Sequence, residues 1–75
     1  MAVLGTDTAA TEPVPFINPA FSTHRAMLVD SGVHLIENLN LEGLAADGVT
    51  EGFFIALPLK ITGATGSWVR PVLVV

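Results

Sequence analysis

The chain has 75 residues, no cysteine and a formal net charge of −4, with 51% hydrophobic and only 13% charged residues. Such a length allows one small domain, which buries roughly 60% of the surface of its unfolded chain. Without cysteine there is no disulfide framework and no thiolate metal site, and a cytoplasmic location is expected. Three Lys and Arg residues cannot form a basic stripe for phosphates, so no nucleic-acid partner is expected.

The apolar content is high for a small free-standing domain, whose surface is normally rich in charged side chains. Mean hydropathy is +0.64. The longest apolar stretch, residues 53–59, contains Pro58 and is far shorter than the ~18 residues of a spanning helix, and the acidic N-terminus lacks a basic signal segment. We therefore expect no membrane association. Instead, a partner subunit or a missing N-terminal half of the same polypeptide is expected to cover apolar surface.

The first part of the chain predicts a short strand, a loop and a helix. Residues 2–4 are apolar and end at a Gly-Thr-Asp-Thr turn, in which Asp7 is a typical turn-forming residue. Three prolines predict an irregular loop over residues 9–22. A helix is expected over residues 24–31, with Ser22 or Thr23 as its N-cap and Gly32 as its left-handed terminator.

Two residues near this helix stand out as candidates for chemistry. His24 lies in the first helical turn, where the helix dipole favours a neutral ring that can act as ligand or base, although a partly exposed polar histidine is the alternative. Residues 33–39 alternate as a strand, which places Glu37 on an aliphatic face and His34 on the opposite face. A carboxylate on an apolar face needs a cationic partner or a metal ion, unless it reaches solvent at the strand end.

The last part of the chain predicts a short helix and two strands. A helical turn or two is expected over residues 41–46, followed by strands over residues 53–62 and 68–75. Both strands are apolar on both faces, which is typical of strands buried in the centre of a sheet. The glycine-containing residues 63–67 between them have the composition of a hairpin loop, and Pro58 marks a bulge or an unpaired position.

Several short motifs, in this order and spacing, resemble the C-terminal part of the cyclase family of metal-dependent hydrolases. This family includes bacterial kynurenine formamidase (arylformamidase), an enzyme of tryptophan catabolism, and isatin hydrolase. The motifs that carry the resemblance are Gly5-Thr6-Asp7-Thr8, His24-Arg25, Ile36-Glu37-Asn38-Leu39, Ala56-Leu57-Pro58-Leu59-Lys60-Ile61, Gly63, Gly66-Ser67 and Val69-Arg70. The chain departs from the family pattern at Trp68, where a proline is common, and in the loop after Glu37.

The resemblance implies an α+β fold: a mostly antiparallel sheet with one or two short helices, as part of a swivelling β/β/α-like domain. Residues 1–75 would be the C-terminal portion of that domain. The implied activity is hydrolysis of an amide C–N bond in an N-formyl or cyclic amide, with zinc or manganese as cofactor. His24 and Glu37 match the later metal ligands of the family, and His24 is alternatively the catalytic proton shuttle to the departing amine.

The main metal-binding motif of the family, His-x-Gly-Thr-His-x-Asp, does not occur in this sequence. The remaining ligands are therefore expected from the missing N-terminal half or from a partner subunit, and the chain alone is expected to be inactive. A homo-oligomer is expected. The alternative interpretation is a non-catalytic, β-rich interaction or dimerisation module, or a remnant without activity.

Overall fold

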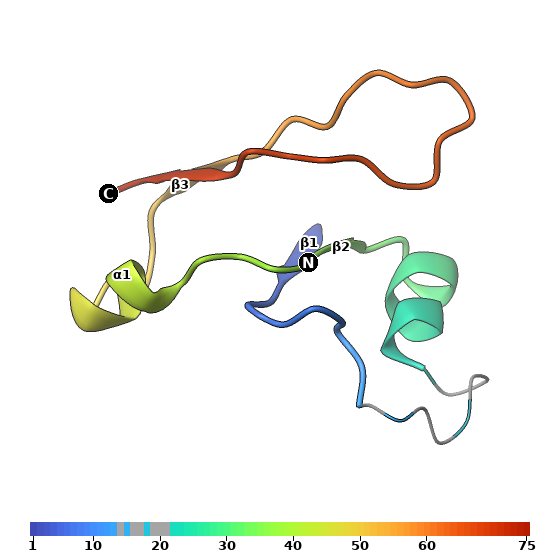
Figure 1. Cartoon of the computed structure of the whole chain (residues 1–75), viewed down its shortest axis with the longest axis horizontal. Coiled ribbons are helices and arrows are strands. Elements are labelled where there is room, and N and C mark those ends of the chain that lie inside the picture. The colour runs from blue at the N-terminus through green and yellow to red at the C-terminus, as the bar shows by residue number, and fades with distance from the viewer. Residues whose placement is uncertain (14, 16–17, 19–21) are drawn as a thin grey trace. The chain divides into compact units, whose positions relative to one another are not determined.

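The computed structural model describes residues 1–13, 15, 18 and 22–75 (Figure 1). The chain divides into two compact units, Met1–Leu41 and Glu42–Val75. The described residues form two short helical segments and two small sheets, which confirms the mixed α+β class. Within these residues, no helix is long and apolar enough to cross a bilayer. Residues 14, 16–17 and 19–21 of the predicted proline-rich loop lie outside the described residues.

The sheet of the first unit is a parallel pair. Strand β1 (Val3–Gly5) pairs with β2 (His34–Ile36), in a register that places Val3 opposite His34 and Gly5 opposite Ile36. Parallel neighbours require a long crossover, and the chain between the two strands, which includes a helical segment, provides it. The expected mostly antiparallel sheet is therefore corrected here, because only the pair in the second unit is antiparallel.

The crossover ends in a helical segment, η2 (Arg25–Asp30), which has the wider spacing of a π-helix. Residues 23–24 are helical and lead into η2, and Oγ of Ser22 accepts the main-chain N–H of Arg25 at 3.1 Å, the kind of hydrogen bond expected of the predicted cap. Gly32 ends it with a φ of +66°, a left-handed conformation that costs glycine little.

Val33 links the helix to the strand and is the one buried hydrophobic residue among those described, at 6% exposed. Its N–H donates to the Met27 carbonyl at 2.7 Å. The strand that follows is shorter than the predicted 33–39, because Asn38 has a φ of +57°, which an extended strand does not allow. Glu37 therefore lies in the turn after β2, and its predicted position on a continuous strand face is wrong.

The second unit contains a short helix and an antiparallel pair. Helix α1 (Glu42–Ala46) ends in a turn at Gly48, which has a φ of +67°. Strand β3 (Phe53–Ile55) pairs with β4 (Val72–Val74), and Phe53 lies opposite Val74. The predicted order of helix, strand, loop and strand is thus confirmed, with shorter strands.

The predicted strands 53–62 and 68–75 contract to three residues each. Pro58 and Pro71 lack a donor for a ladder, which limits pairing in the connecting segment. The apolar side chains predicted to be buried are exposed in this structure, with Leu57 at 80% and Trp68 at 90%. The second unit therefore presents a large uncovered apolar surface.

Candidate functional site

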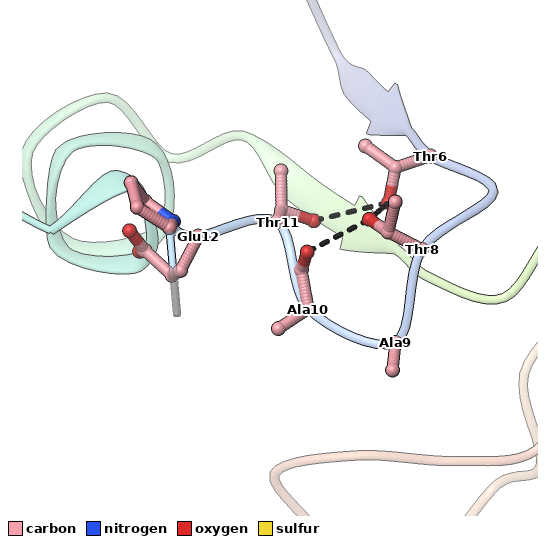
Figure 2. A pocket seen from close by; sticks show the side chains of 7 residues that line it. Thr6, Thr8, Ala9, Ala10, Thr11 and Glu12 are labelled. Atoms are coloured by element: carbon pink, nitrogen blue, oxygen red, sulfur yellow. Dashed lines mark hydrogen bonds between the residues drawn. The ribbon is translucent and has the colours of Figure 1, made fainter. Parts of the chain in front are cut away.

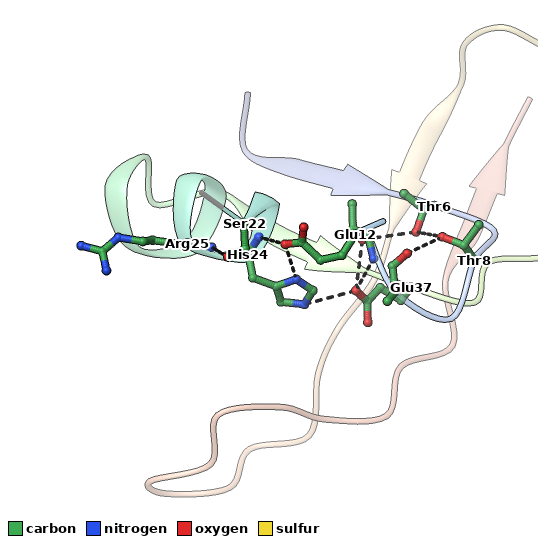
Figure 3. Close-up of polar contacts among 9 residues, drawn as sticks. Thr6, Thr8, Glu12, Ser22, His24, Arg25 and Glu37 are labelled. Carbon is green, nitrogen blue, oxygen red and sulfur yellow. Dashed lines mark hydrogen bonds and ion pairs between the residues drawn. The ribbon is translucent and has the colours of Figure 1, made fainter. Parts of the chain in front are cut away.

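The first unit holds one imidazole ring between two carboxylates (Figure 3). Nδ1 of His24 lies 3.0 Å from Oε1 of Glu12, and its Nε2 lies 3.3 Å from Oε1 of Glu37. The three residues come from different segments: the loop after β1, the start of the helix and the turn after β2. The structure thus brings the two predicted site residues, His24 and Glu37, together and adds Glu12.

Glu37 is held by the loop that carries Glu12. Its Oε1 accepts the main-chain N–H of Thr11 at 2.9 Å and the hydroxyl of Thr11 at 3.1 Å. The side chain is 27% exposed, so one side of the carboxylate still reaches solvent. The sequence analysis expected a cationic partner or a metal ion for Glu37, but the nearby cation Arg25 points away from it in the same view (Figure 3). Among the described residues of this unit, the hydrogen-bond and ion-pair partners given for Glu37 are the His24 imidazole and Thr11.

Glu12 is the most enclosed of the three side chains, at 3% exposed. Its Oε1 accepts a hydrogen bond from the main-chain N–H of His24 and also contacts Nδ1 of the His24 ring. The main chain and the side chain of Thr23 hydrogen-bond to the same carboxylate. Burial acts to raise the pKa of Glu12, but these hydrogen bonds from His24 and Thr23 outweigh it, so the pKa lies below its ordinary value. The carboxylate therefore also caps the helix that carries His24.

Sequence reasoning did not identify Glu12. An acidic side chain is favourable at a helix N-terminus, and this preference was the available signal. The proline-rich loop separates Glu12 from the helix along the chain, so local spacing could not reveal the contact. His34 and Asp7, the other polar candidates, are both exposed.

Three threonines organise the loop that carries Glu12. The hydroxyl of Thr8 donates to the Ala10 carbonyl at 2.8 Å, and the hydroxyl of Thr6 lies 3.3 Å from those of both Thr8 and Thr11. A shallow, open hollow lies beside this cluster (Figure 2). Its lining residues are Thr6, Thr8, Ala9, Ala10, Thr11, Glu12 and Pro13.

Main-chain hydrogen bonds fasten the threonine loop to the turn after β2. The Asn38 N–H donates to the Thr8 carbonyl at 2.9 Å, and the Leu39 N–H donates to the Thr6 carbonyl at 2.9 Å. Backbone pairing therefore fixes the distance between the loop and Glu37. The side-chain bonds of Thr11 then orient the carboxylate.

The separation between Nε2 of His24 and Oε1 of Glu37 is that of an ion pair, and it is also compatible with two donors on one metal ion. Two donors on one tetrahedral zinc ion, with bonds of about 2.1 Å, lie about 3.4 Å apart. The observed separation of 3.3 Å matches that value and is longer than a usual N–H···O hydrogen bond of ~2.9 Å. Glu12 approaches the other ring nitrogen, so the three side chains do not converge on one point. In the part of the chain that the structure describes, no group of three or more His, Cys, Asp or Glu side chains could hold a metal ion.

Comparisons with protein-family models, with curated proteins and with solved structures gave no match for this chain.

Proposed function

We propose that the chain contributes part of the active site of a metal-dependent hydrolase that cleaves an amide C–N bond, as its resemblance to the cyclase family implies. The observation that carries the proposal is the 3.3 Å separation of His24 Nε2 and Glu37 Oε1. These two residues are the ones that the resemblance matches to metal ligands. The substrate class is an N-formyl or cyclic amide, and the metal is zinc or manganese, both of which accept imidazole and carboxylate donors.

A divalent metal bound here would supply a water of lowered pKa and would polarise the amide carbonyl. The residues of this chain would hold and orient the side chains that bind the metal. Thr11 fixes the Glu37 carboxylate through two hydrogen bonds to one oxygen. The His24 side chain is 41% exposed and places Nε2 3.3 Å from Oε1 of Glu37. In the alternative role, the same nitrogen would carry a proton to the departing amine.

The proposal requires further donors, because a catalytic zinc site commonly uses three protein ligands and His24 and Glu37 supply two. We propose that the N-terminal half of the same enzyme or a partner subunit supplies them, and that the chain alone is inactive. The uncovered apolar side chains of the second unit support this, since Phe53 is 68% exposed and Trp68 is 90% exposed. Apolar surface of this kind is typical of an interface, including that of a homo-oligomer.

Calorimetric titration of the full chain with zinc and manganese tests the proposal. Binding is expected in the wild-type chain and is expected to weaken at least tenfold in both His24→Ala and Glu37→Gln, since each removes a donor. His34→Ala is the matched control, because it removes an exposed histidine outside the site. Equal binding by all four chains, or no binding by the wild type, would contradict the proposed metal site.

The exposed apolar surface also favours a second candidate function, a non-catalytic interaction or dimerisation module. Concentration-dependent self-association in sedimentation experiments, together with no metal binding at His24 and Glu37, would favour this second function. Metal binding that depends on both residues would favour the hydrolase. The two measurements on the same preparation therefore separate the candidates.

A further inference from the structure

We infer that the β3–β4 pair packs face to face against the same pair of a second copy of this chain, with the strands of the two copies running in opposite directions. The surface in contact is the side of the pair that carries Phe53, Ile55, Val72 and Val74, hereafter the Phe53 face. The proposed function expects an apolar interface but gives it neither a surface nor an orientation. The inference goes beyond that function, because it concerns the second unit alone and requires no metal ion.

The register of the two strands defines the Phe53 face. Phe53 lies opposite Val74, and Ile55 lies opposite Val72. Residues opposite each other in an antiparallel pair share one side of the sheet, so these four side chains form one continuous apolar surface. Each of them is between 39% and 68% exposed. Phe54 lies between Phe53 and Ile55 along β3 and therefore belongs to the other side of the pair.

The second unit does not cover this face by itself. An isolated two-stranded hairpin is marginally stable, and a sheet becomes stable when a second layer packs on its apolar side. In the part of the chain that the structure describes, helix α1 does not pack against β3 or β4. The missing layer must therefore come from elsewhere, and an identical β3–β4 pair has the matching shape and composition.

The exposed apolar area is sufficient for a stable dimer. The Phe53 face and the segments that continue from it expose on the order of 900 Å², taking about 180 Å² for a whole large apolar side chain. A stable protein–protein interface buries about 800 Å² on each partner. The exposed side chains are those of Phe53, Ile55, Leu57, Leu59, Ile61, Trp68, Val72 and Val74.

The distribution of charge favours a second copy and sets its orientation. Residues 42–51 carry three acidic and no basic side chains, whereas residues 52–75 carry Lys60 and Arg70 and no acidic side chain. Glu51 precedes the start of β3, and the basic residues lie towards the loop at the opposite end of the pair (Figure 1). A complementary partner has these charges in the reverse order, and an antiparallel second copy is such a partner.

The spacing of these charges suits a two-fold axis through the centre of the pair. Phe54 and Leu73 lie opposite each other at that centre. Glu51 is three positions before Phe54, and Arg70 is three positions before Leu73 on the strand that runs the other way. A two-fold axis there brings Glu51 of each copy level with Arg70 of the other. Both side chains are exposed, and neither has an ion-pair partner among the described residues.

Sedimentation equilibrium of the full chain and of charge-reversed variants tests the inference. The wild-type chain should form a dimer, and Glu51→Arg and Arg70→Glu should each weaken it about tenfold, since each reversal creates two like-charge contacts. The double variant Glu51→Arg/Arg70→Glu should restore the dimer to within threefold of wild type. Asp30→Arg is the matched control, because it makes the same change of net charge at an exposed position of the first unit. Single reversals no weaker than Asp30→Arg, or a double variant no tighter than the single ones, would overturn the antiparallel arrangement.

Two substitutions at neighbouring positions test the choice of face. Phe53→Ser should weaken the dimer at least tenfold, whereas Phe54→Ser should leave it within threefold of wild type, because that ring lies on the other side of the pair. Equal weakening by both would overturn the assignment of the Phe53 face. If Phe53→Ser does not fold, the charge reversals still decide, since they change exposed side chains only.

The association state also separates this inference from the proposed metal site. A wild-type chain that stays monomeric at millimolar concentration, or that forms aggregates without a defined stoichiometry, would overturn the inference and leave the face to the missing N-terminal half. A dimer that binds neither zinc nor manganese would retain the inference and refute the metal site. A monomer that binds metal through His24 and Glu37 would do the reverse.

Discussion

The hydroxyl of Thr11 should contribute measurably to holding the turn that carries Glu37. Thr11→Val keeps the shape of the side chain and the main-chain N–H bond of 2.9 Å, but removes the O–H···O bond of 3.1 Å to Oε1. Hydrogen bonds to charged groups contribute about 1.5–3 kcal/mol. Because Glu37 is 27% exposed and water competes for it, the low end applies. We expect a loss of about 1.5 kcal/mol, which is roughly tenfold in the opening equilibrium of this turn.

Amide hydrogen exchange measures this effect directly. The N–H groups of Asn38 and Leu39 fasten the turn to the threonine loop, so both should exchange about tenfold faster in Thr11→Val. Thr50→Val makes the same chemical change at an exposed position and should leave both rates unchanged. Rates within twofold of wild type in Thr11→Val, or an equal acceleration in Thr50→Val, would refute the reasoning.

Two further predictions concern pH and close packing. Because the pKa of Glu12 lies below its ordinary value of 4.5, its stabilising contribution should be complete above that pH and lost as the pH falls through the lower folded pKa. Urea unfolding between pH 3 and 7 should show a smaller acid-induced loss in Glu12→Gln than in wild type, and parallel curves would contradict this. A Cβ on Gly52 would lie 2.8 Å from the carbonyl oxygen of Val74, so Gly52→Ala should destabilise the β3–β4 pair by about 1–3 kcal/mol. A Cβ on Gly66 would lie in open space, so Gly66→Ala should not destabilise the β3–β4 pair. Equal hydrogen-exchange rates of the β3 amides in the two variants would contradict the predicted clash at Gly52.

The local elements of the first unit were predictable because short-range chemistry specifies them. A hydroxyl before a helix satisfies a free N–H, and a glycine after it adopts a left-handed turn, so Ser22 and Gly32 marked the helix ends correctly. The resemblance to the cyclase family implied that His24 and Glu37 belong to one site, and Nε2 of His24 lies 3.3 Å from Oε1 of Glu37. The hydrolase activity and the metal remain predictions.

Strand length was less predictable, because pairing depends on what lies beside a segment. The apolar composition of residues 53–62 favours an extended conformation, but only Phe53–Ile55 finds a partner here. Likewise, Glu37 follows the alternating pattern of a strand, yet the left-handed conformation of Asn38 turns the chain away. Amino-acid propensity indicates which backbone conformations a segment can adopt, whereas the available hydrogen-bonding partners decide how many of its residues pair in a sheet.

The sequence by itself predicted the Ser22 hydrogen bond at the helix start and the left-handed turn at Gly32, since each follows from interactions between near neighbours. It also singled out His24 and Glu37, whose side chains lie 3.3 Å apart. Only the tertiary structure decided that Glu12 caps the helix and holds the His24 ring. Glu12 lies 12 positions before His24, and the sequence between them has no periodic pattern that predicts a contact. The pairing forms because an enclosed carboxylate needs donors, and the start of a helix supplies free N–H groups that no residue within it can satisfy.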